Sequence, residues 1–276
     1  ARLTMTQDSP TDLSGFTKAL KLDCTTADTS IGSAEYIQLH YRIEGQDLQQ
    51  LKKGTSDAEK ITVSFYVKGN ASATYTCEIE DVDNNRYNSQ EFSVTTSWTK
   101  VTLTYNADTT GVLDNDNGTS MAINFWLHVG SNFTGGTHTD NVWHTTANQR
   151  VGDNQTSFAD STDRTFFLTG LQMEIGSVAT PFESISAGES LQLCQRYFQK
   201  SIQSGTTSYP SSDGYARGMY LFPVQMRADP TGTFTDAGSG GSSASNSTNQ
   251  DGYVNTYGSL AASSAGQFSW TMDAEL

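Results

Sequence analysis

Strict alternation of apolar and polar residues is the feature that most restricts what this chain can fold into. Six stretches show it: residues 36–44, 61–69, 74–82, 98–106, 122–130 and 165–176. A period of two is typical of a β-strand with one buried face, and turn-forming stretches such as "DVDNNR" and "DNDNGTS" separate the runs. The pattern predicts antiparallel sheets that each bury one face. The expected inward residues are Ile37, Leu39, Tyr41, Ile43, Ile61, Val63, Phe65, Val67, Tyr75, Cys77, Ile79, Val101, Leu103, Tyr105, Ile123, Phe125, Leu127, Val129, Phe167, Leu171, Met173 and Ile175.

The spacing of these runs predicts two modules. At least eight strands before Glu183 predict an all-β jelly-roll β-sandwich over residues 1–184, and further strand patterns predict a smaller C-terminal β module over residues 185–276. Helix is expected only as a short turn at 45–54 and after Ser186, where Ser186 and Glu189 form a capping box. The polar stretch 130–161 is expected to be a long loop, and the low-complexity stretch 236–252 a mobile loop.

Charge, hydropathy and cysteine content argue against several kinds of partner and site. Acidic residues outnumber basic ones 30 to 16, giving a net charge of −14, which argues against a nucleic-acid partner or an anionic membrane surface. No apolar run reaches the length of a membrane span. The 3 cysteines include no CxxC pair, so neither a thiolate zinc site nor a disulfide framework is expected. The chain opens in a strand-like pattern without an initiator Met, so we expect it to begin within a longer gene product.

Three landmarks resemble known families. "KITVSFYVKGNASATYTCEIED" followed by "SVTTSWTKVTLTY" resembles the CenC-type carbohydrate-binding-module jelly roll, in which a Trp, here Trp98, starts the second of two strands. "LQMEIGSVATPFE" with "GESLQLCQRYFQKS", and then "FPVQMRADPTGTF", resemble a junction and a C-terminal module of tailed-phage tail-fibre and adhesin proteins. The resemblance implies a virion structural protein with a sugar-binding type of fold, although a fold does not establish a function.

The outward face of two strands is the candidate ligand-binding site. Aromatic rings stack on sugar rings, and polar side chains bond their hydroxyls. The alternative is that another subunit or the C-terminal module covers this face, since an exposed Trp is costly. Trp126→Ala should then leave the fold nearly intact but weaken attachment or assembly. The candidate residues are Tyr36, Gln38, His40 and Arg42 on one strand and Asn124, Trp126 and His128 on the other.

No catalytic residues are expected, because no paired carboxylates, nucleophile elbow or phosphate loop can be placed. His138 and His144 share the long loop with two aspartates, which allows a metal site or a triad, with a solvated loop as the simpler reading. No cofactor is expected apart from a structural calcium ion, of the kind that sandwich modules of the resembled type often hold. Its candidate ligands are Asp114 and Asp116, although Gly118 breaks the EF-hand order.

These observations together predict a non-enzymatic phage virion protein, a tail fibre or tail-associated receptor-binding protein that attaches to host surface glycans. The expected state is a homo-oligomer, a trimer, in contact with other virion proteins on the tail or capsid surface. A capsid decoration or head-fibre protein and a secreted bacterial carbohydrate-binding module are the alternatives.

Overall fold

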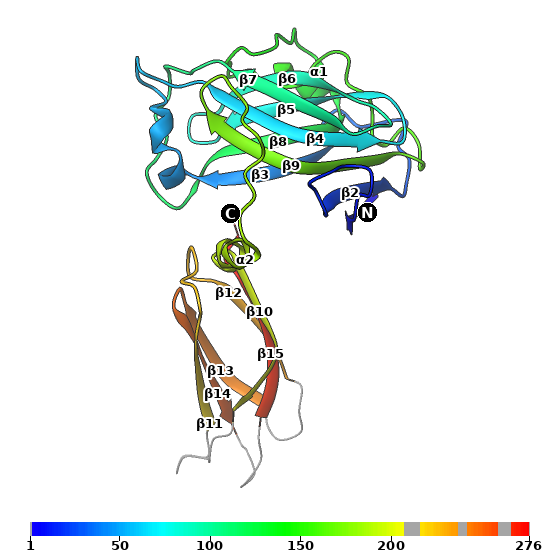
Figure 1. The fold of residues 1–276 in the computed structure, drawn as a ribbon. Coiled ribbons are helices and arrows are strands. Elements are labelled where there is room, and N and C mark those ends of the chain that lie inside the picture. Colours follow the sequence, from blue (N-terminus) through cyan, green and yellow to red (C-terminus); the bar gives the residue numbers. More distant parts are fainter. Residues whose placement is uncertain (1, 207–215, 237–241, 259–265, 276) are drawn as a thin grey trace. The chain divides into compact units, whose positions relative to one another are not determined.

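The computed structural model describes residues 2–206, 216–236, 242–258 and 266–275. The fold is all-β, a jelly-roll sandwich followed by a smaller β module, as the alternation predicted (Figure 1). The chain separates into two compact units, Ala1–Glu183 and Ser184–Leu276. In the described part of the chain, no helix is long and apolar enough to cross a bilayer.

The first unit is a sandwich of two antiparallel sheets. One sheet has the order β1-β2-β9-β4-β7, and the other has the order β3-β8-β5-β6. Three 3₁₀ turns, Gly45–Asp47, Gln49–Leu51 and Ala147–Gln149, and the short helix α1 (Ser131–Thr134) lie between strands. The strands are β1 (Leu3–Asp8), β2 (Ala19–Cys24), β3 (Tyr36–Glu44), β4 (Ile61–Gly69), β5 (Ala73–Asp81), β6 (Arg86–Val94), β7 (Thr99–Tyr105), β8 (Thr119–Val129) and β9 (Thr165–Ile175).

The core lies between the two sheets and is built by the predicted alternation. Strands β4, β5 and β8 supply half of its buried residues, and Phe65 makes edge-to-face contacts with Phe92 and Phe125 at centroid distances of 5.2 and 5.0 Å. Tyr41 is an exception on edge strand β3, since it is 57% exposed although it was expected to point inward. Fully buried positions that the pattern identified include Val63, Val67, Cys77, Ile79, Tyr105, Ile123 and Leu127.

The prediction for β9 was wrong over its first half. Phe166 and Leu168 are buried there instead of Phe167, and Ile175 at the far end is 43% exposed. The pairing of β9 with β4 shifts register beside Gly170, whose φ is +60°. A β-bulge adds one residue to a strand and so reverses which residues face inward beyond it. Leu171 and Met173 lie after this bulge and pack partly against the core, as expected.

The long polar stretch after β8 folds back onto the outer face of the four-stranded sheet. We call residues 131–160 the covering segment. It pairs with the sheet at several points: the N–H of Asn141 donates to Ser89 O at 3.0 Å, that of Thr156 to Thr74 O at 2.8 Å, and that of Phe158 to Leu127 O at 2.7 Å. These bonds tie down a segment that has little regular structure of its own, so the outer face of the sheet is largely buried.

The second unit contains a helix and two three-stranded sheets, of order β10-β15-β12 and β11-β14-β13. Helix α2 (Ala187–Gln195) is capped by Ser186, whose side chain accepts from the Glu189 N–H, as the capping box predicted. The prediction of a mobile loop at 236–252 was wrong over β13, where strand pairing with β14 orders the polar run; residues 237–241 lie outside the described residues. The strands are β10 (Phe198–Thr206), β11 (Ala216–Leu221), β12 (Thr231–Asp236), β13 (Ser242–Asn249), β14 (Gly252–Gly258) and β15 (Gly266–Asp273).

Candidate functional site

Strand register places the candidate residues in rows across the outer face of the β3-β8-β5-β6 sheet. Residues opposite each other on neighbouring strands share a face and contact one another. A register shift between Ile37 and Gln38 brings Gln38 opposite Trp126. The three rows from β3 through β8 to β5 are Gln38–Trp126–Thr76, His40–Asn124–Glu78 and Arg42–Ala122–Glu80.

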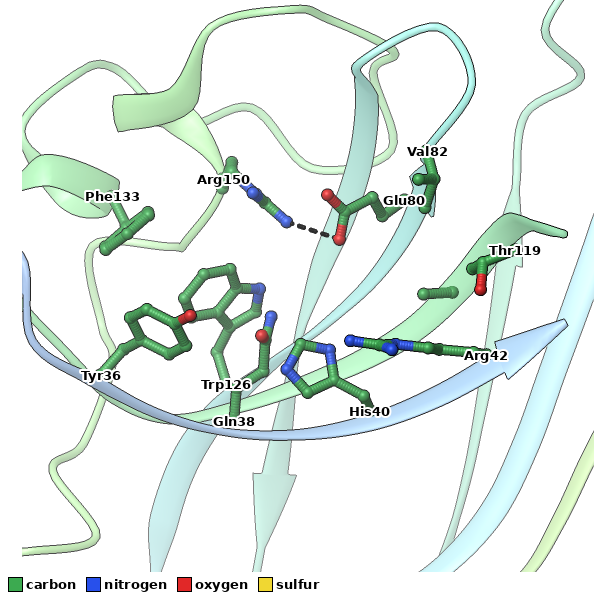
Figure 2. A pocket seen from close by; sticks show the side chains of 11 residues that line it. Tyr36, Gln38, His40, Arg42, Glu80, Val82, Thr119, Trp126, Phe133 and Arg150 are labelled. Atoms are coloured by element: carbon green, nitrogen blue, oxygen red, sulfur yellow. Dashed lines mark ion pairs between the residues drawn. The ribbon is translucent and has the colours of Figure 1, made fainter. Parts of the chain in front are cut away.

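A groove of about 440 Å³ lies over these rows, and we call it the outer-face groove (Figure 2). Its floor comes from β3, β8 and β5, and the covering segment supplies Phe133 and Arg150 on one side (Figure 2). Small-molecule sites are commonly concavities of about 300–1,000 Å³ that mix apolar surface with a few polar groups. The lining residues are Tyr36, Gln38, His40, Arg42, Glu80, Val82, Thr119, Ala122, Trp126, Phe133 and Arg150.

Three aromatic rings form one end of the groove. Trp126 is 1% exposed and lies 5.1 Å from Phe133 and 5.5 Å from Tyr36 between ring centroids. Tyr36 also meets Phe133 edge-on at 5.3 Å and remains 50% exposed. The Tyr36 ring is therefore held in place by two others while half of its surface stays available to a ligand.

A buried ion pair fixes the wall that the covering segment supplies. Arg150 donates to both oxygens of Glu78, at 2.9 Å from Nε and 2.6 Å from Nη2, and pairs with Glu80 Oε2 at 3.0 Å. Its guanidinium lies 3.9 Å from the centre of the Tyr87 ring and 5.0 Å from that of Trp126. Burial raises the pKa of the Glu78 carboxyl, and the hydrogen bonds from Arg150 and Asn124 oppose the rise. Arg150 thus joins the covering segment to the sheet.

Asn124 links this ion pair to His40. Its Nδ2 donates to Glu78 Oε1 at 2.9 Å and to Glu80 Oε2 at 2.7 Å, and its Oδ1 lies 2.9 Å from His40 Nδ1. Because Asn124 Oδ1 is an acceptor, His40 must carry its proton on Nδ1, which leaves Nε2 as an acceptor. Partial burial lowers the pKa of His40, and the Asn124 contact opposes this. His40 is therefore neutral at neutral pH.

The structure brings five of the seven sequence-predicted ligand residues into one groove: Tyr36, Gln38, His40, Arg42 and Trp126. Asn124 lies beneath it, 0% exposed, and His128 lines a different pocket, where its Nδ1 is 2.6 Å from Ser157 Oγ. The expectation that Asn124, Trp126 and His128 are exposed was wrong. They do point away from the core, but the covering segment buries them, so their cover is neither a sugar, a second subunit nor the C-terminal module.

The candidate calcium ligands lie in the loop before β8. The Asp114 N–H donates to Asp83 Oδ2 at 2.9 Å, and Asp116 Oδ1 accepts from the Gly118 N–H at 2.8 Å. Within the described residues, no group of three or more His, Cys, Asp or Glu side chains is placed to hold a metal ion. Calcium binding at Asp114 and Asp116 stays a prediction.

The histidines of the covering segment are separated by the fold. His138 Nε2 lies 3.0 Å from Ser89 Oγ, and its Nδ1 is 3.7 Å from Asp140 Oδ1, an order of groups like that of a triad. Ser89 is 1% exposed, however, so a substrate has no access to its hydroxyl. His144 instead forms a backbone bridge with Tyr87. The arrangement serves to attach the covering segment to β6.

Sequence reasoning missed Glu80, Phe133 and Arg150 at the groove. One signal was present: Glu78 and Glu80 alternate with the core residues Cys77 and Ile79, so they face the same side as Trp126. Two carboxylates on a sheet face need a cation if that face is covered. Arg150 is the single Lys or Arg between residues 131 and 161, which makes it the cation that the covering segment could supply.

Comparisons with known proteins identify no family. No family model matches the sequence, and no curated protein matches it significantly. Among solved structures, the chain is similar to a family 11 carbohydrate-binding module from Clostridium thermocellum in complex with a mixed-linked tetrasaccharide, at 12% identity over 64% of this chain and 85% of that one, with a TM-score of 0.32.

Two other solved structures are similar to the chain. The N-terminal cellulose-binding domain of a Cellulomonas fimi β-1,4-glucanase matches at 14% identity over 63% of this chain and 84% of that one, with a TM-score of 0.32. Discoidin II from Dictyostelium discoideum matches at 10% identity over 92% of this chain and 75% of that one, with a TM-score of 0.23. Such low identities and TM-scores establish neither a shared family nor a shared ligand.

Proposed function

We propose that this chain is a non-catalytic carbohydrate-binding protein whose ligand occupies the outer-face groove. The observation that carries the proposal is the half-exposed ring of Tyr36, backed by Trp126 and Phe133 and flanked by His40 and Arg42. A sugar presents an apolar ring face and a rim of hydroxyls, so it needs an aromatic surface beside polar side chains. A groove of about 440 Å³ with both kinds of surface fits that need.

The carboxylates nearest the groove favour binding over hydrolysis. Glycoside hydrolysis uses two carboxyl groups that flank the scissile bond. Glu78 is 0% exposed and held by Arg150 through both oxygens, and Glu80 is held by Arg150 and Asn124 through Oε2. We therefore expect no release of reducing sugar from any glycan that the protein binds. Release that disappears in Glu80→Gln would contradict the non-catalytic part of the proposal.

A pair of tyrosines on β3 provides the test of the groove. Tyr36 lines the groove at 50% exposure, while Tyr41 on the same strand is 57% exposed and lies outside the groove lining. With a ligand found on a glycan array, Tyr36→Ala should weaken binding by about 30-fold or more in calorimetry, the loss typical of an aromatic anchor. Tyr41→Ala should leave binding unchanged. Equal losses, or no sugar bound at all, would contradict the proposal.

We propose further that the bound glycan belongs to a host cell surface and that the chain is a tail-fibre or receptor-binding component of a tailed-phage particle. This rests on the sequence resemblance of residues 171–201 and 222–234. Antibodies against the chain should label purified particles at the tail. Labelling over the head would favour a decoration or head-fibre protein. Recovery of the chain free in the medium, without particles, would favour a secreted bacterial module.

A further inference from the structure

Three charged side chains from separate parts of the sandwich meet in a buried cluster. Lys53 follows the 3₁₀ turn Gln49–Leu51, Asp81 ends β5, and Asp108 lies in the loop after β7. The three side chains, in that order, are 4%, 0% and 4% exposed. Lys53 Nζ contacts Asp81 Oδ2, and Asp108 Oδ2 lies 3.0 Å from the same nitrogen. An amine is therefore held against one carboxyl group, with a second carboxyl group beside it, away from water.

Asn84 holds the other oxygen of Asp81. Its backbone N–H donates to Asp81 Oδ1 at 3.0 Å, and its Nδ2 lies 3.1 Å from Oδ1 and 3.0 Å from Oδ2. The orientation of the Asn84 amide is fixed, because Nδ2 also donates to the carbonyl oxygen of Val112 at 2.9 Å. Two N–H groups at about this distance from an oxygen stabilise the negative charge that develops on it during acyl transfer. Attack of an amine on Asp81 Cγ would place such a charge on Oδ1.

Asp108 is placed to take a proton from the amine. Burial raises the pKa of its carboxyl, but hydrogen bonds from Arg86 and Lys53 lower this pKa and outweigh burial. Arg86 donates two of these bonds, at 2.7 Å to Oδ2 and at 2.9 Å to Oδ1. Asp108 is thus ionised at neutral pH. It can accept a proton from Lys53 as a general base and then return it to a leaving oxygen as a general acid.

The burial of this ion pair favours its conversion into an amide. Taking two charges out of water is costly, and their mutual attraction offsets that cost only in part. An amide between Lys53 and Asp81 would replace both charges by one neutral group. Groups held in reacting geometry also behave as if present at about 10⁵–10⁸ M, which favours condensation over hydrolysis.

We propose that Lys53 and Asp81 condense spontaneously to form an intramolecular isopeptide bond. The bond between Lys53 Nζ and Asp81 Cγ forms, and the bond between Cγ and Oδ2 breaks. Two of the three hydrogens on Nζ leave with Oδ2 as one water molecule, and Asp108 relays them. Asp81 Oδ1 becomes the amide oxygen and keeps its bonds from Asn84. One ammonium and one carboxylate disappear together, so charge balances and the step requires no oxidant or cofactor.

The mass of the denatured full chain tests the proposal. It should be lower than the mass calculated from the sequence by one water molecule. After tryptic digestion, cleavage after Lys53 should be lost, and the peptide that contains Lys53 should be joined to the one that contains Asp81. Lys52 is the internal control, because it pairs with Glu59 at 3.0 Å where both side chains are exposed, at 53% and 39%. Lys52 should remain unmodified.

Variants separate the cross-link from other losses of water. Lys53→Met removes the amine and should have the full calculated mass. Asp108→Asn keeps the volume of the side chain but removes the base, so the cross-linked fraction should fall at least about tenfold in samples of equal age. Glu59→Gln, the matched change beside Lys52, should leave the cross-link as it is in the parent.

Each contrary result has a defined meaning. A parent chain of full mass would overturn the proposal, and this measurement needs no variant that must fold. Loss of water that persists in Lys53→Met would also overturn it, because the water must then come from another site. Cross-linking of Asp108→Asn to the parental extent would overturn the role given to Asp108. The readout is a mass, so carbohydrate binding stands or falls separately.

Discussion

Replacing Arg150 by methionine would leave the carboxylate of Glu78 buried without its cation. Glu78 is 0% exposed, and Arg150 donates to both of its oxygens, at 2.9 and 2.6 Å. Removing one partner of a buried pair costs about 3–5 kcal/mol, because the remaining charge stays desolvated. The guanidinium also stacks on Tyr87 at 3.9 Å, which adds about 0.5–2 kcal/mol, and the methionine side chain refills part of the lost volume. We expect a net loss of about 4 kcal/mol in the free energy of unfolding, a large part of the stability of a typical domain.

The loss should depend on pH in a defined direction. In the variant, burial raises the pKa of Glu78 with no guanidinium to oppose it. A carboxyl whose folded-state pKa lies above its unfolded-state value favours the folded state at low pH, and this contribution is lost as the pH rises through the folded-state pKa. The difference in free energy of unfolding between the parent and Arg150→Met should therefore become smaller as the pH is lowered from about 7 to about 5.

Urea unfolding followed by tryptophan fluorescence would measure the effect, since Trp126 lies 5.0 Å from the Arg150 guanidinium. Arg164→Met is the matched control, because Arg164 also contacts a carboxylate through two nitrogens, but its partner Asp160 is 39% exposed, and exposed pairs contribute about 0–1 kcal/mol. The double variant Glu78→Gln with Arg150→Met should recover most of the stability. Equal losses in Arg150→Met and Arg164→Met would refute the reasoning.

Four further outcomes are expected. Val63→Asp or Phe125→Asp should unfold the sandwich, because these sites are 0% and 1% exposed; an unchanged melting temperature would mean that the inner face is assigned wrongly. Trp126→Ala should cost about 3–5 kcal/mol in chemical unfolding, contrary to the sequence-based expectation of an intact fold, and a loss under about 1 kcal/mol would contradict its burial. Sugar affinity measured by calorimetry should stay flat above about pH 7, because burial lowers the pKa of His40 and keeps it neutral there, so a step in Kd near pH 8 would contradict its assignment. Light scattering at micromolar concentration should give a trimer or another cyclic oligomer, and a stable monomer would count against the virion setting.

The sandwich could be predicted from sequence because its core follows local alternation. Strands such as β4 and β5 place every second residue inward, and the core positions named for them are buried. The same rule failed in β9, where Gly170 and the register shift beside it change the phase. A bulge is a property of the pairing between two strands, so the apolar pattern of one strand does not contain it.

The groove could be predicted only in part, for a related reason. Tyr36, Gln38, His40 and Arg42 alternate along one strand, so their common face was readable. Whether the face of Trp126 lay open depended on where the covering segment folds, and that is set by bonds to distant residues such as Thr74, Ser89 and Leu127. A polar segment can lie in solvent or pack on a sheet, so the composition of the covering segment did not indicate that it buries Trp126.

The division of the groove between a buried wall and an edge strand has a consequence for how its specificity can evolve. Trp126 and Arg150 hold the covering segment to the sheet, so substitutions there lower stability before they alter recognition. Tyr36, His40 and Arg42 are exposed on β3, at the edge of the sheet. They contribute less to the stability of the fold than the two buried residues do. Relatives of this chain with a different groove ligand should therefore vary in sequence at these β3 positions and keep the buried wall unchanged.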